Sequence, residues 1–288
     1  MSEIVFENVG HSFGERTVLQ QIDLRLSEQR IGIVGANGSG KSTLARMING
    51  LVVPTEGHVH VNGLDTAKKG RDVRKQVGFV FTDPNHQIVM PTVAEDIEFS
   101  LRRSGLGKAE RAAKVASVLE RYGLAGHADH PTHQLSGGQK QLLALAAIMV
   151  TEPNVLVADE PTTLLDLRNS RLISSVFESL DQQLIVVTHQ LDLLESFERV
   201  LVVDQGRVVA DGSPPPTRSI TTGRWSRDHS RRLPAGHIAP APDADGGSSS
   251  SPWSWPSSPS RSSCASRGNW QLPRSSLWPC TRLRAFLR

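Results

Sequence analysis

Residues 35–43 read Gly-Ala-Asn-Gly-Ser-Gly-Lys-Ser-Thr, which matches the phosphate-binding pattern G-x-x-x-x-G-K-[ST]. Glycines let backbone N–H groups close around a polyphosphate, while Lys41 offers a cation and Ser42 offers a hydroxyl to Mg²⁺. A dinucleotide loop fits less well, because G-x-G-x-x-G does not require Lys-Ser at its end. The sequence therefore predicts a nucleoside triphosphate site. The expected nucleotide-binding residues are Gly35, Asn37, Gly38, Ser39, Gly40, Lys41, Ser42 and Thr43.

Two apolar runs end in side chains that suit phosphate chemistry. One run ends in Asp159 and Glu160, and the other, at 184–189, ends in His189. At the carboxyl end of a strand beside the loop, Asp159 can join Ser42 around Mg²⁺ and Glu160 can polarise a water. His189 can hydrogen-bond a γ-phosphate or the attacking water. A solvated acidic turn and a structural histidine are the alternatives, and the phosphate loop in the same chain favours the functional interpretation.

Three aromatic or imidazole side chains are weaker candidates. Phe13 lies 22 residues before Gly35 and could stack on an adenine ring, although the residues alone favour a Phe packed at a strand end. His58 and His60 alternate with valines and so share one face of a short predicted strand. A solvated strand face explains them better than a metal site, because no third ligand lies nearby in sequence.

Residues 135–139 read Leu-Ser-Gly-Gly-Gln and open a helix rich in Ala and Leu. Ser136 and the backbone N–H groups at this helix start form a second anion site. One polyphosphate cannot occupy two distant sites on one subunit, unless a second copy brings its helix over the first copy's nucleotide. Four further nucleotide-binding residues follow from this, contributed across a dimer: Ser136, Gly137, Gly138 and Gln139.

Hydrophobic periodicity predicts the elements that position these groups. Strands are expected at 4–9, 22–26, 31–34, 58–61, 77–81, 154–161, 184–189, 200–204 and 207–210, and helices at 44–49, 92–103, 108–122 and from 137 onward. Thr92 is the expected N-cap of its helix, with Glu95 in the capping-box position. The region 85–150 is therefore mostly helical and lies between strands of a nucleotide-binding core.

Together, residues 35–43, 135–139, 155–160 and His189 resemble the nucleotide-binding subunit of an ATP-binding cassette (ABC) transporter. The order and spacing match over about residues 1–212. The resemblance implies an α/β fold of the P-loop NTPase class, with a mixed sheet core, an antiparallel β subdomain and a helical subdomain at about 85–150. It also implies two subunits that clamp two ATP molecules head to tail.

The resemblance assigns roles to matching positions. Phe13 corresponds to the adenine-stacking aromatic. Asp159 would hold Mg²⁺ with Ser42, Glu160 would be the general base for the attacking water, and His189 would contact the γ-phosphate. Residues 164–166 read Leu-Leu-Asp and match the dimer-interface loop after the catalytic Glu, with Asp166 as its carboxylate.

One position departs from the family pattern. After the strand at 77–81 the family usually has a Gln that touches Mg²⁺ and the lytic water, and here the residue is Thr82. Residues 82–97 still resemble the energy-coupling-factor (ECF) ATPases of vitamin and metal-ion uptake, in which a second Gln matches Gln87. Gln87 is carried over as a metal-ligand candidate. The Thr variant looks most like the biotin-type system, and a Thr side chain is too short for the reach of Gln.

These features predict the ATP-hydrolysing subunit of an ECF-type importer, with ATP and Mg²⁺ as cofactors and biotin as the favoured solute. Cobalt or nickel uptake is the rival solute, and a soluble non-transport ABC ATPase or a pure binding module is the rival class. The expected partners are a second ABC ATPase, identical or not, a membrane coupling subunit and a substrate-binding membrane subunit, without nucleic acid. The expected location is the cytoplasmic face of the membrane, peripherally bound.

Composition changes abruptly at about residue 213. Residues 1–212 carry 21 Lys and Arg against 26 Asp and Glu, whereas residues 213–288 carry 11 Arg against 3 acidic residues and hold all five Trp and both Cys. The second segment is rich in Ser and Pro without periodicity, which predicts disorder. Its basic character could serve lipid or nucleic acid, but the absence of a specific role is the favoured interpretation. The excess of Arg, Ser, Pro and Trp also resembles a gene read out of frame, which is a further hypothesis. No signal peptide is apparent, and the longest apolar run, at 142–150, is 9 residues against about 20 for a membrane span.

Overall fold

The structure, a computed structural model, describes residues 2–214, all within the first of two compact units of the chain, Met1–Pro234. The domain predicted at 1–212 therefore lies within the described residues except for its first residue. The tail predicted at 213–288 lies outside them except for its first two residues. Within 2–214, every helix is too short or too polar to cross a bilayer.

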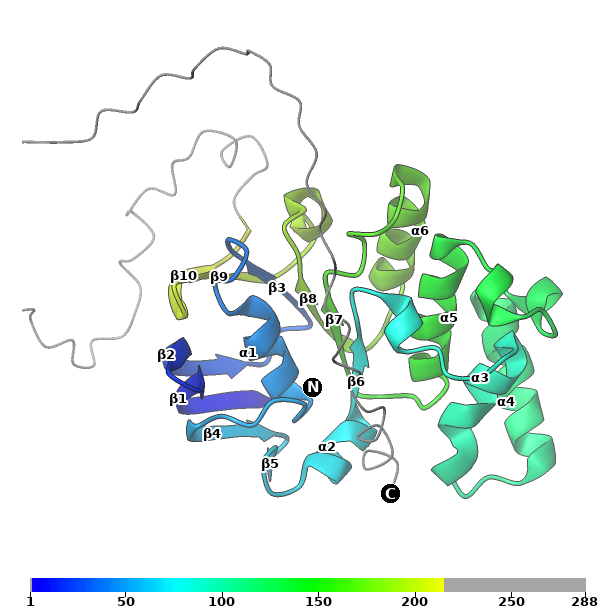
Figure 1. The fold of residues 1–288 in the computed structure, drawn as a ribbon, viewed down its shortest axis with the longest axis horizontal. Helices are drawn as coiled ribbons and strands as arrows, with labels where there is room; N and C mark the ends of the chain where they lie inside the picture. Colours follow the sequence, from blue (N-terminus) through cyan, green and yellow to red (C-terminus); the bar gives the residue numbers. More distant parts are fainter. Residues whose placement is uncertain (1, 215–288) are drawn as a thin grey trace, which may run out of the picture. The chain divides into compact units, whose positions relative to one another are not determined.

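A six-stranded sheet forms the centre of the described unit (Figure 1). Its strand order is β10-β9-β3-β8-β7-β6, and neighbouring strands are parallel except for β10 and β9. The strands are β3 (Arg30–Val34), β6 (Val77–Val80), β7 (Val155–Asp159), β8 (Gln183–Val187), β9 (Arg199–Asp204) and β10 (Arg207–Gly212). β7 and β8 are buried along their whole length, as expected for parallel strands covered on both faces.

A second, four-stranded sheet is antiparallel, with strand order β2-β1-β4-β5. Its strands are β1 (Ile4–Phe13), β2 (Arg16–Leu26), β4 (Glu56–Val61) and β5 (Leu64–Asp65). Along β2, Ile22, Leu24 and Leu26 are buried while Asp23 and Arg25 are exposed. This alternation of period two covers one face of the sheet and leaves the other to solvent.

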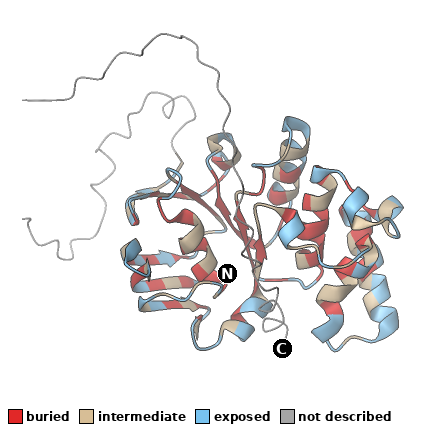
Figure 2. Ribbon diagram, in the orientation of Figure 1, coloured by how far each residue is buried: buried red, intermediate tan, exposed pale blue. Residues whose placement is uncertain are grey.

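Helices cover both faces of the six-stranded sheet (Figures 1 and 2). Helix α1 contacts β2 and β4 of one sheet and β7 and β8 of the other, so it lies between the two sheets. In β7, Val155 and Val157 join the core around α1, whereas Leu156 and Ala158 join the core formed with the helices of the opposite face. The helices are α1 (Lys41–Ile48), α2 (Gly70–Gln76), α3 (Val93–Ser100), α4 (Lys108–Arg121), α5 (Gly137–Met149) and α6 (Leu167–Glu178).

Two details of the helical prediction are corrected. The helix predicted at 92–103 ends as α3 at Ser100 and continues as a 3₁₀ turn, Leu101–Arg103. The predicted capping box is wrong, because the Thr92 hydroxyl donates to the Glu95 carboxylate at 2.9 Å instead of accepting the backbone N–H. Helices α2 and α6 were not predicted. All elements between β6 and β7 are helical, apart from an isolated bridge between Thr92 and Pro131.

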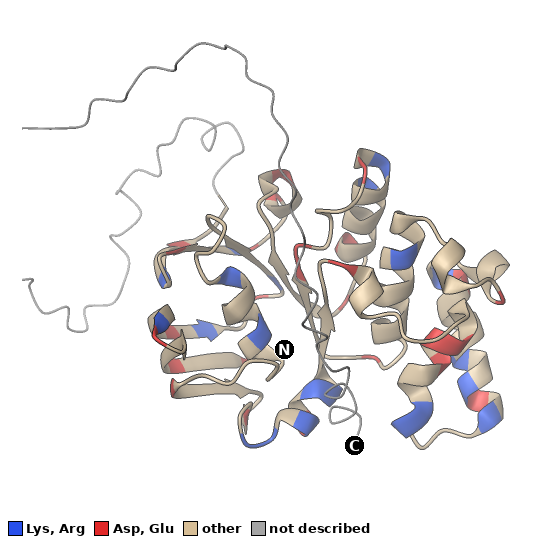
Figure 3. Ribbon diagram, viewed as in Figure 1, with Lys and Arg blue, Asp and Glu red and all other residues tan. Residues whose placement is uncertain are grey.

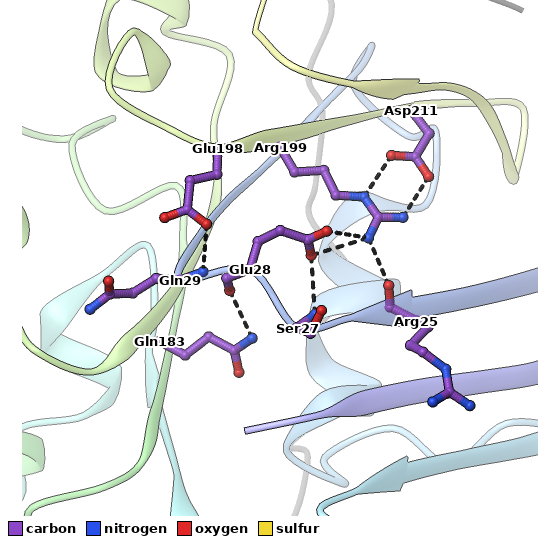
Figure 4. Close-up of polar contacts among 8 residues, drawn as sticks. All are labelled: Arg25, Ser27, Glu28, Gln29, Gln183, Glu198, Arg199 and Asp211. Carbon is purple, nitrogen blue, oxygen red and sulfur yellow. Dashed lines mark hydrogen bonds and ion pairs between the residues drawn. The ribbon is translucent and has the colours of Figure 1, made fainter. Parts of the chain in front are cut away.

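Arg199 ties the final strand to the connection between β2 and β3 (Figure 4). Its Nη1 donates to Glu28 Oε1 at 3.0 Å and to the Arg25 carbonyl at 2.7 Å, while Nε and Nη2 donate to the two Asp211 carboxylate oxygens at 2.7 and 2.6 Å. Burial raises the pKa of Glu28, but its own backbone N–H, that of Ser27 and the Arg199 charge outweigh burial, so the pKa lies below its usual value. The edge at β10 is therefore fixed by a half-buried guanidinium.

Within residues 2–214, no group of three or more His, Cys, Asp or Glu side chains is arranged to hold a metal ion. Figure 3 shows charges of both signs on the outer surface of α4, which is typical of a solvated helix face. His58 Nδ1 lies 3.6 Å from Asp65 Oδ2, and His60 is its ring neighbour at 6.1 Å. These contacts fit the solvated strand face expected for the two histidines.

Candidate nucleotide-binding site

The phosphate loop joins β3 to α1 and depends on two glycines. Gly35 has φ 151° and Gly40 has φ 106°, both in a region that favours glycine. A Cβ on Gly35 would lie 2.0 Å from the Val203 carbonyl oxygen, and a Cβ on Gly40 would lie 2.7 Å from Leu19 Cδ2. Strands β9 and β2 therefore press against the loop and leave no room for a side chain at either position.

Lys41 and Phe13 face the same hollow beside the loop. Lys41 is only 5% exposed, and its Nζ donates one of its three hydrogens to the Ala36 carbonyl at 2.9 Å. A cavity of about 290 Å³ is lined by Phe13, Arg16, Val18, Gly38, Gly40, Lys41, Ser42 and Thr43. Phe13 ends β1, is 57% exposed and forms a T-shaped pair with the His11 ring, with the two ring centroids 4.5 Å apart. Phe13, from the four-stranded antiparallel sheet, therefore lies beside the phosphate loop that follows β3 of the six-stranded sheet.

Ser42 and Asp159 meet at the first turn of α1. The Ser42 hydroxyl donates to Asp159 Oδ1 at 2.7 Å, and Arg46 Nη2 forms an ion pair with Asp159 Oδ2 at 3.1 Å. Asp159 is 1% exposed, so a carboxylate is held in the interior with each oxygen bound. Burial without such partners would be costly for a charged group.

Glu160 and His189 form the next pair along this edge. Glu160 has φ 53°, and its carboxylate Oε2 accepts from the Thr163 hydroxyl at 2.9 Å and lies 2.7 Å from His189 Nδ1. A carboxylate only accepts, so Nδ1 carries the proton in this contact. The carboxyl ends of neighbouring β7 and β8 bring the two side chains together, as the topology of a parallel sheet requires.

The Ser136–Gln139 turn starts α5 and packs against the start of α6. The Ser136 N–H donates to Gln139 Oε1 at 2.9 Å, and the Gln139 N–H donates to Ser136 Oγ at 3.3 Å, which is a complete capping box. A Cβ on Gly138 would lie 2.2 Å from Asn169 Oδ1. Asp166 caps α6 by accepting from the Asn169 N–H at 2.8 Å. Two segments predicted separately to reach a dimer partner are therefore neighbours on one surface.

This surface is separate from the phosphate loop of the same chain. Within residues 2–214, no hydrogen bond or ion pair joins Ser136, Gly137, Gly138 or Gln139 to residues 35–43. That one chain cannot fill both anion sites with one nucleotide stays a prediction.

Gln87 does not lie with the oxygen groups expected around Mg²⁺. Its Oε1 accepts from the Phe81 N–H at 3.4 Å and its Nε2 donates to the Ala144 carbonyl at 2.9 Å. The amide therefore links the end of β6 to α5. Its role as a metal ligand stays a prediction without support from these contacts.

The family model of ABC transporters matches residues 19–163. This chain belongs to the ABC transporter family. It is 49% identical over 208 residues to the biotin transport ATP-binding protein BioM of Rhizobium etli. This alignment covers 72% of this chain and 92% of that protein. It is 41% identical over 204 residues to the energy-coupling factor transporter ATP-binding protein EcfA1 of Caldanaerobacter subterraneus subsp. tengcongensis, covering 68% and 74% of the two chains.

A solved structure of an ATP-binding cassette, a dimer in a post-hydrolysis state bound to ADP and phosphate, is similar in fold. The TM-score is 0.64 at 28% identity, and the match covers 74% of this chain and 99% of that one. The predicted family, fold class and ATPase activity are confirmed. The chain is the ATP-binding subunit of an ABC transporter that resembles the energy-coupling-factor ATPases, while the roles of individual site residues stay predictions.

Sequence reasoning missed several residues of this ABC site. Arg46 was overlooked, although its i, i+4 spacing from Ser42 places both on one face of α1. Thr163 and Asn169 were not considered, because their contacts depend on how the turn after Glu160 folds. His127 was also missed: its Nε2 lies 2.9 Å from the Nε2 of Gln139, across twelve residues, and no local pattern indicates that contact.

Proposed function

We propose that this chain powers an ECF-type importer whose solute is biotin, by hydrolysing ATP between two ATPase subunits. The observation that carries the chemistry is the shared edge at which Ser42 contacts Asp159 and Glu160 contacts His189, beside the phosphate loop. The observation that favours biotin is the 49% identity to BioM over nearly the whole of that protein.

Nucleotide binding rests on the loop and on Phe13. Because Gly35, Gly38 and Gly40 have no side chains, phosphate oxygens can approach the backbone N–H groups of the loop. The N-terminus of α1 adds partial positive charge. The remaining hydrogens of the Lys41 ammonium would bind phosphate oxygens. Phe13, which is exposed at the same cavity, would stack on adenine.

Magnesium fits the oxygen groups present here. The Ser42 hydroxyl and an Asp159 carboxylate oxygen lie 2.7 Å apart, and such hard oxygens are the ligands that Mg²⁺ prefers. Ser42 and Asp159 would hold the ion together with phosphate oxygens. When bound, the ion would neutralise charge that develops on the phosphates during transfer.

Glu160 would accept a proton from the attacking water, and His189 would orient that water or the γ-phosphate. The His189 imidazole already holds the Glu160 carboxylate at 2.7 Å, which fixes the base before water is present. The γ-phosphate then leaves ADP as water adds to phosphorus, and the proton taken by Glu160 passes to the products.

Completion of the site would require a second ATPase, identical or related. The Ser136–Gln139 turn and the Asp166 loop lie side by side, and the turn shares no hydrogen bond with the phosphate loop of its own chain. They would cover the nucleotide of the partner, and the exposed Leu164 and Leu167 beside Asp166 would be buried there. Membrane coupling and solute-binding subunits would receive the motion at the cytoplasmic face, where this chain would bind peripherally.

The test is solute uptake into liposomes that contain the full-length chain with its membrane subunits. We expect ATP-dependent accumulation of labelled biotin. Uptake of Co²⁺ or Ni²⁺ instead of biotin would contradict the proposed solute and leave the proposed ATPase activity intact. Failure of the wild-type complex to hydrolyse ATP would overturn the proposal as a whole.

Glu160→Gln is the matched variant, because it keeps the shape of the side chain and removes the base. It should bind ATP, form a nucleotide-trapped dimer and lose turnover by at least about 100-fold, as expected for a general base. Light scattering with ATP measures the dimer. A strictly monomeric variant, both free and with the membrane subunits, would contradict the shared site.

A further inference from the structure

Thr82 contacts the backbone of the catalytic turn. It follows β6, and its hydroxyl donates to the Asp159 carbonyl at 2.8 Å. The N–H of the same peptide, that of Glu160, donates to the Val187 carbonyl at 2.9 Å. Both polar atoms of the Asp159–Glu160 peptide are therefore bonded, one towards β6 and the other towards β8, the strands on either side of β7.

The orientation of this peptide decides where the Glu160 carboxylate lies. Glu160 is one of the non-glycine residues with positive φ, at 53°, a conformation that persists only where neighbouring groups hold it. Rotation of the peptide would change this φ and carry the carboxylate away from His189, which it contacts at 2.7 Å. Thr82 holds the carbonyl end against such rotation.

The position of Thr82 is itself fixed. Gln87 accepts from the N–H of Phe81, the residue before Thr82, and donates to Ala144 in α5. The end of β6 is thus tied to the helix that starts at Ser136. The Thr82 hydroxyl hydrogen is thereby committed to the Asp159 carbonyl.

We propose that Thr82 is a positioning residue for ATP hydrolysis, whose hydroxyl fixes the Asp159–Glu160 peptide and thereby holds Glu160 in its catalytic conformation. The proposal rests on the proposed function of Glu160 as the general base. It gives the hydroxyl of this residue a task at the backbone, distinct from contact with metal or water.

The test uses three variants of the full-length chain assembled with its membrane subunits. Thr82→Val keeps the shape and removes the hydroxyl, Thr82→Ala removes the hydroxyl without a β-branch, and Thr82→Ser keeps the hydroxyl. Loss of one neutral hydrogen bond predicts that kcat falls about 3- to 10-fold in the Val and Ala variants. KM for ATP should stay within about twofold, because the C=O and N–H of this peptide are bonded to Thr82 and Val187 and not to the nucleotide loop. Thr82→Ser should restore kcat to within about twofold of the wild type.

Three results would overturn the proposal. One is a kcat of the Val and Ala variants within about twofold of the wild type. Another is a Ser variant as slow as these two, since the hydroxyl would then not be the cause. The third is a raised KM with unchanged kcat, which would place Thr82 in nucleotide binding. A wild-type complex without ATP hydrolysis would instead remove the proposed function, and this proposal with it.

Discussion

Replacing Arg46 tests how the buried carboxylate at the centre of the site is stabilised. Arg46 forms an ion pair with Asp159 at 3.1 Å, and the two side chains are 42% and 1% exposed. Breaking a fully buried pair costs about 3–5 kcal/mol, because the remaining charge is left unpaired. A fully exposed pair contributes about 0–1 kcal/mol. Water reaches Arg46 but hardly reaches Asp159, so we expect Arg46→Met to lower the free energy of unfolding by about 1–3 kcal/mol.

For a domain of this size, at about 2–4 °C per kcal/mol, that loss corresponds to a decrease in Tm of about 2–12 °C. Scanning calorimetry of the nucleotide-free chain measures it, with Arg46→Lys as the control that keeps the charge. A cation beside Asp159 would replace the lost charge, so the difference from the wild type should narrow in saturating Mg-ATP. An unchanged Tm without nucleotide, or a difference that Mg-ATP leaves the same, would refute this account of Asp159.

Two further changes test packing and burial away from the nucleotide loop. Gly138→Ala places a Cβ 2.2 Å from Asn169 Oδ1, so it should destabilise the fold by about 1–3 kcal/mol in chemical denaturation. Gly137→Ala is its control, because a Cβ there would lie 4.0 Å from Leu165 Cδ2, an ordinary contact, and equal effects would contradict the packing argument. Burial raises the pKa of Asp96 above 3.8 although its Oδ1 accepts from two backbone N–H groups, so the folded state loses stability as pH rises above that value. Asp96→Asn should therefore be more stable than the wild type at neutral pH, and this difference in stability should shrink as pH falls towards 3.8. A difference that grows on acidification would contradict a raised pKa for Asp96.

Local sequence determined the parts of this protein whose physics is local. The phosphate loop is a contiguous run in which glycine supplies positive φ and the next helix supplies its N-terminus, so residues 35–43 could be recognised without a structure. The buried strands could also be predicted from the sequence, since β7 and β8 are apolar on both faces and therefore form continuous apolar runs. Helix α6 was missed although Ile173 and Phe177, its two buried residues, lie four residues apart on one helix face.

Tertiary structure decided which functional groups meet. Arg46 and Asp159 are 113 residues apart, and Thr82 lies 77 residues before the peptide it contacts. The parallel order β3-β8-β7-β6 brings the carboxyl ends of distant segments to one edge, and no local pattern encodes that order. The sequence alone therefore determined the kinds of chemical groups available and the conformation of the loop. Only the folded sheet determined their pairing, because each contact depends on strand neighbours that are far apart along the chain.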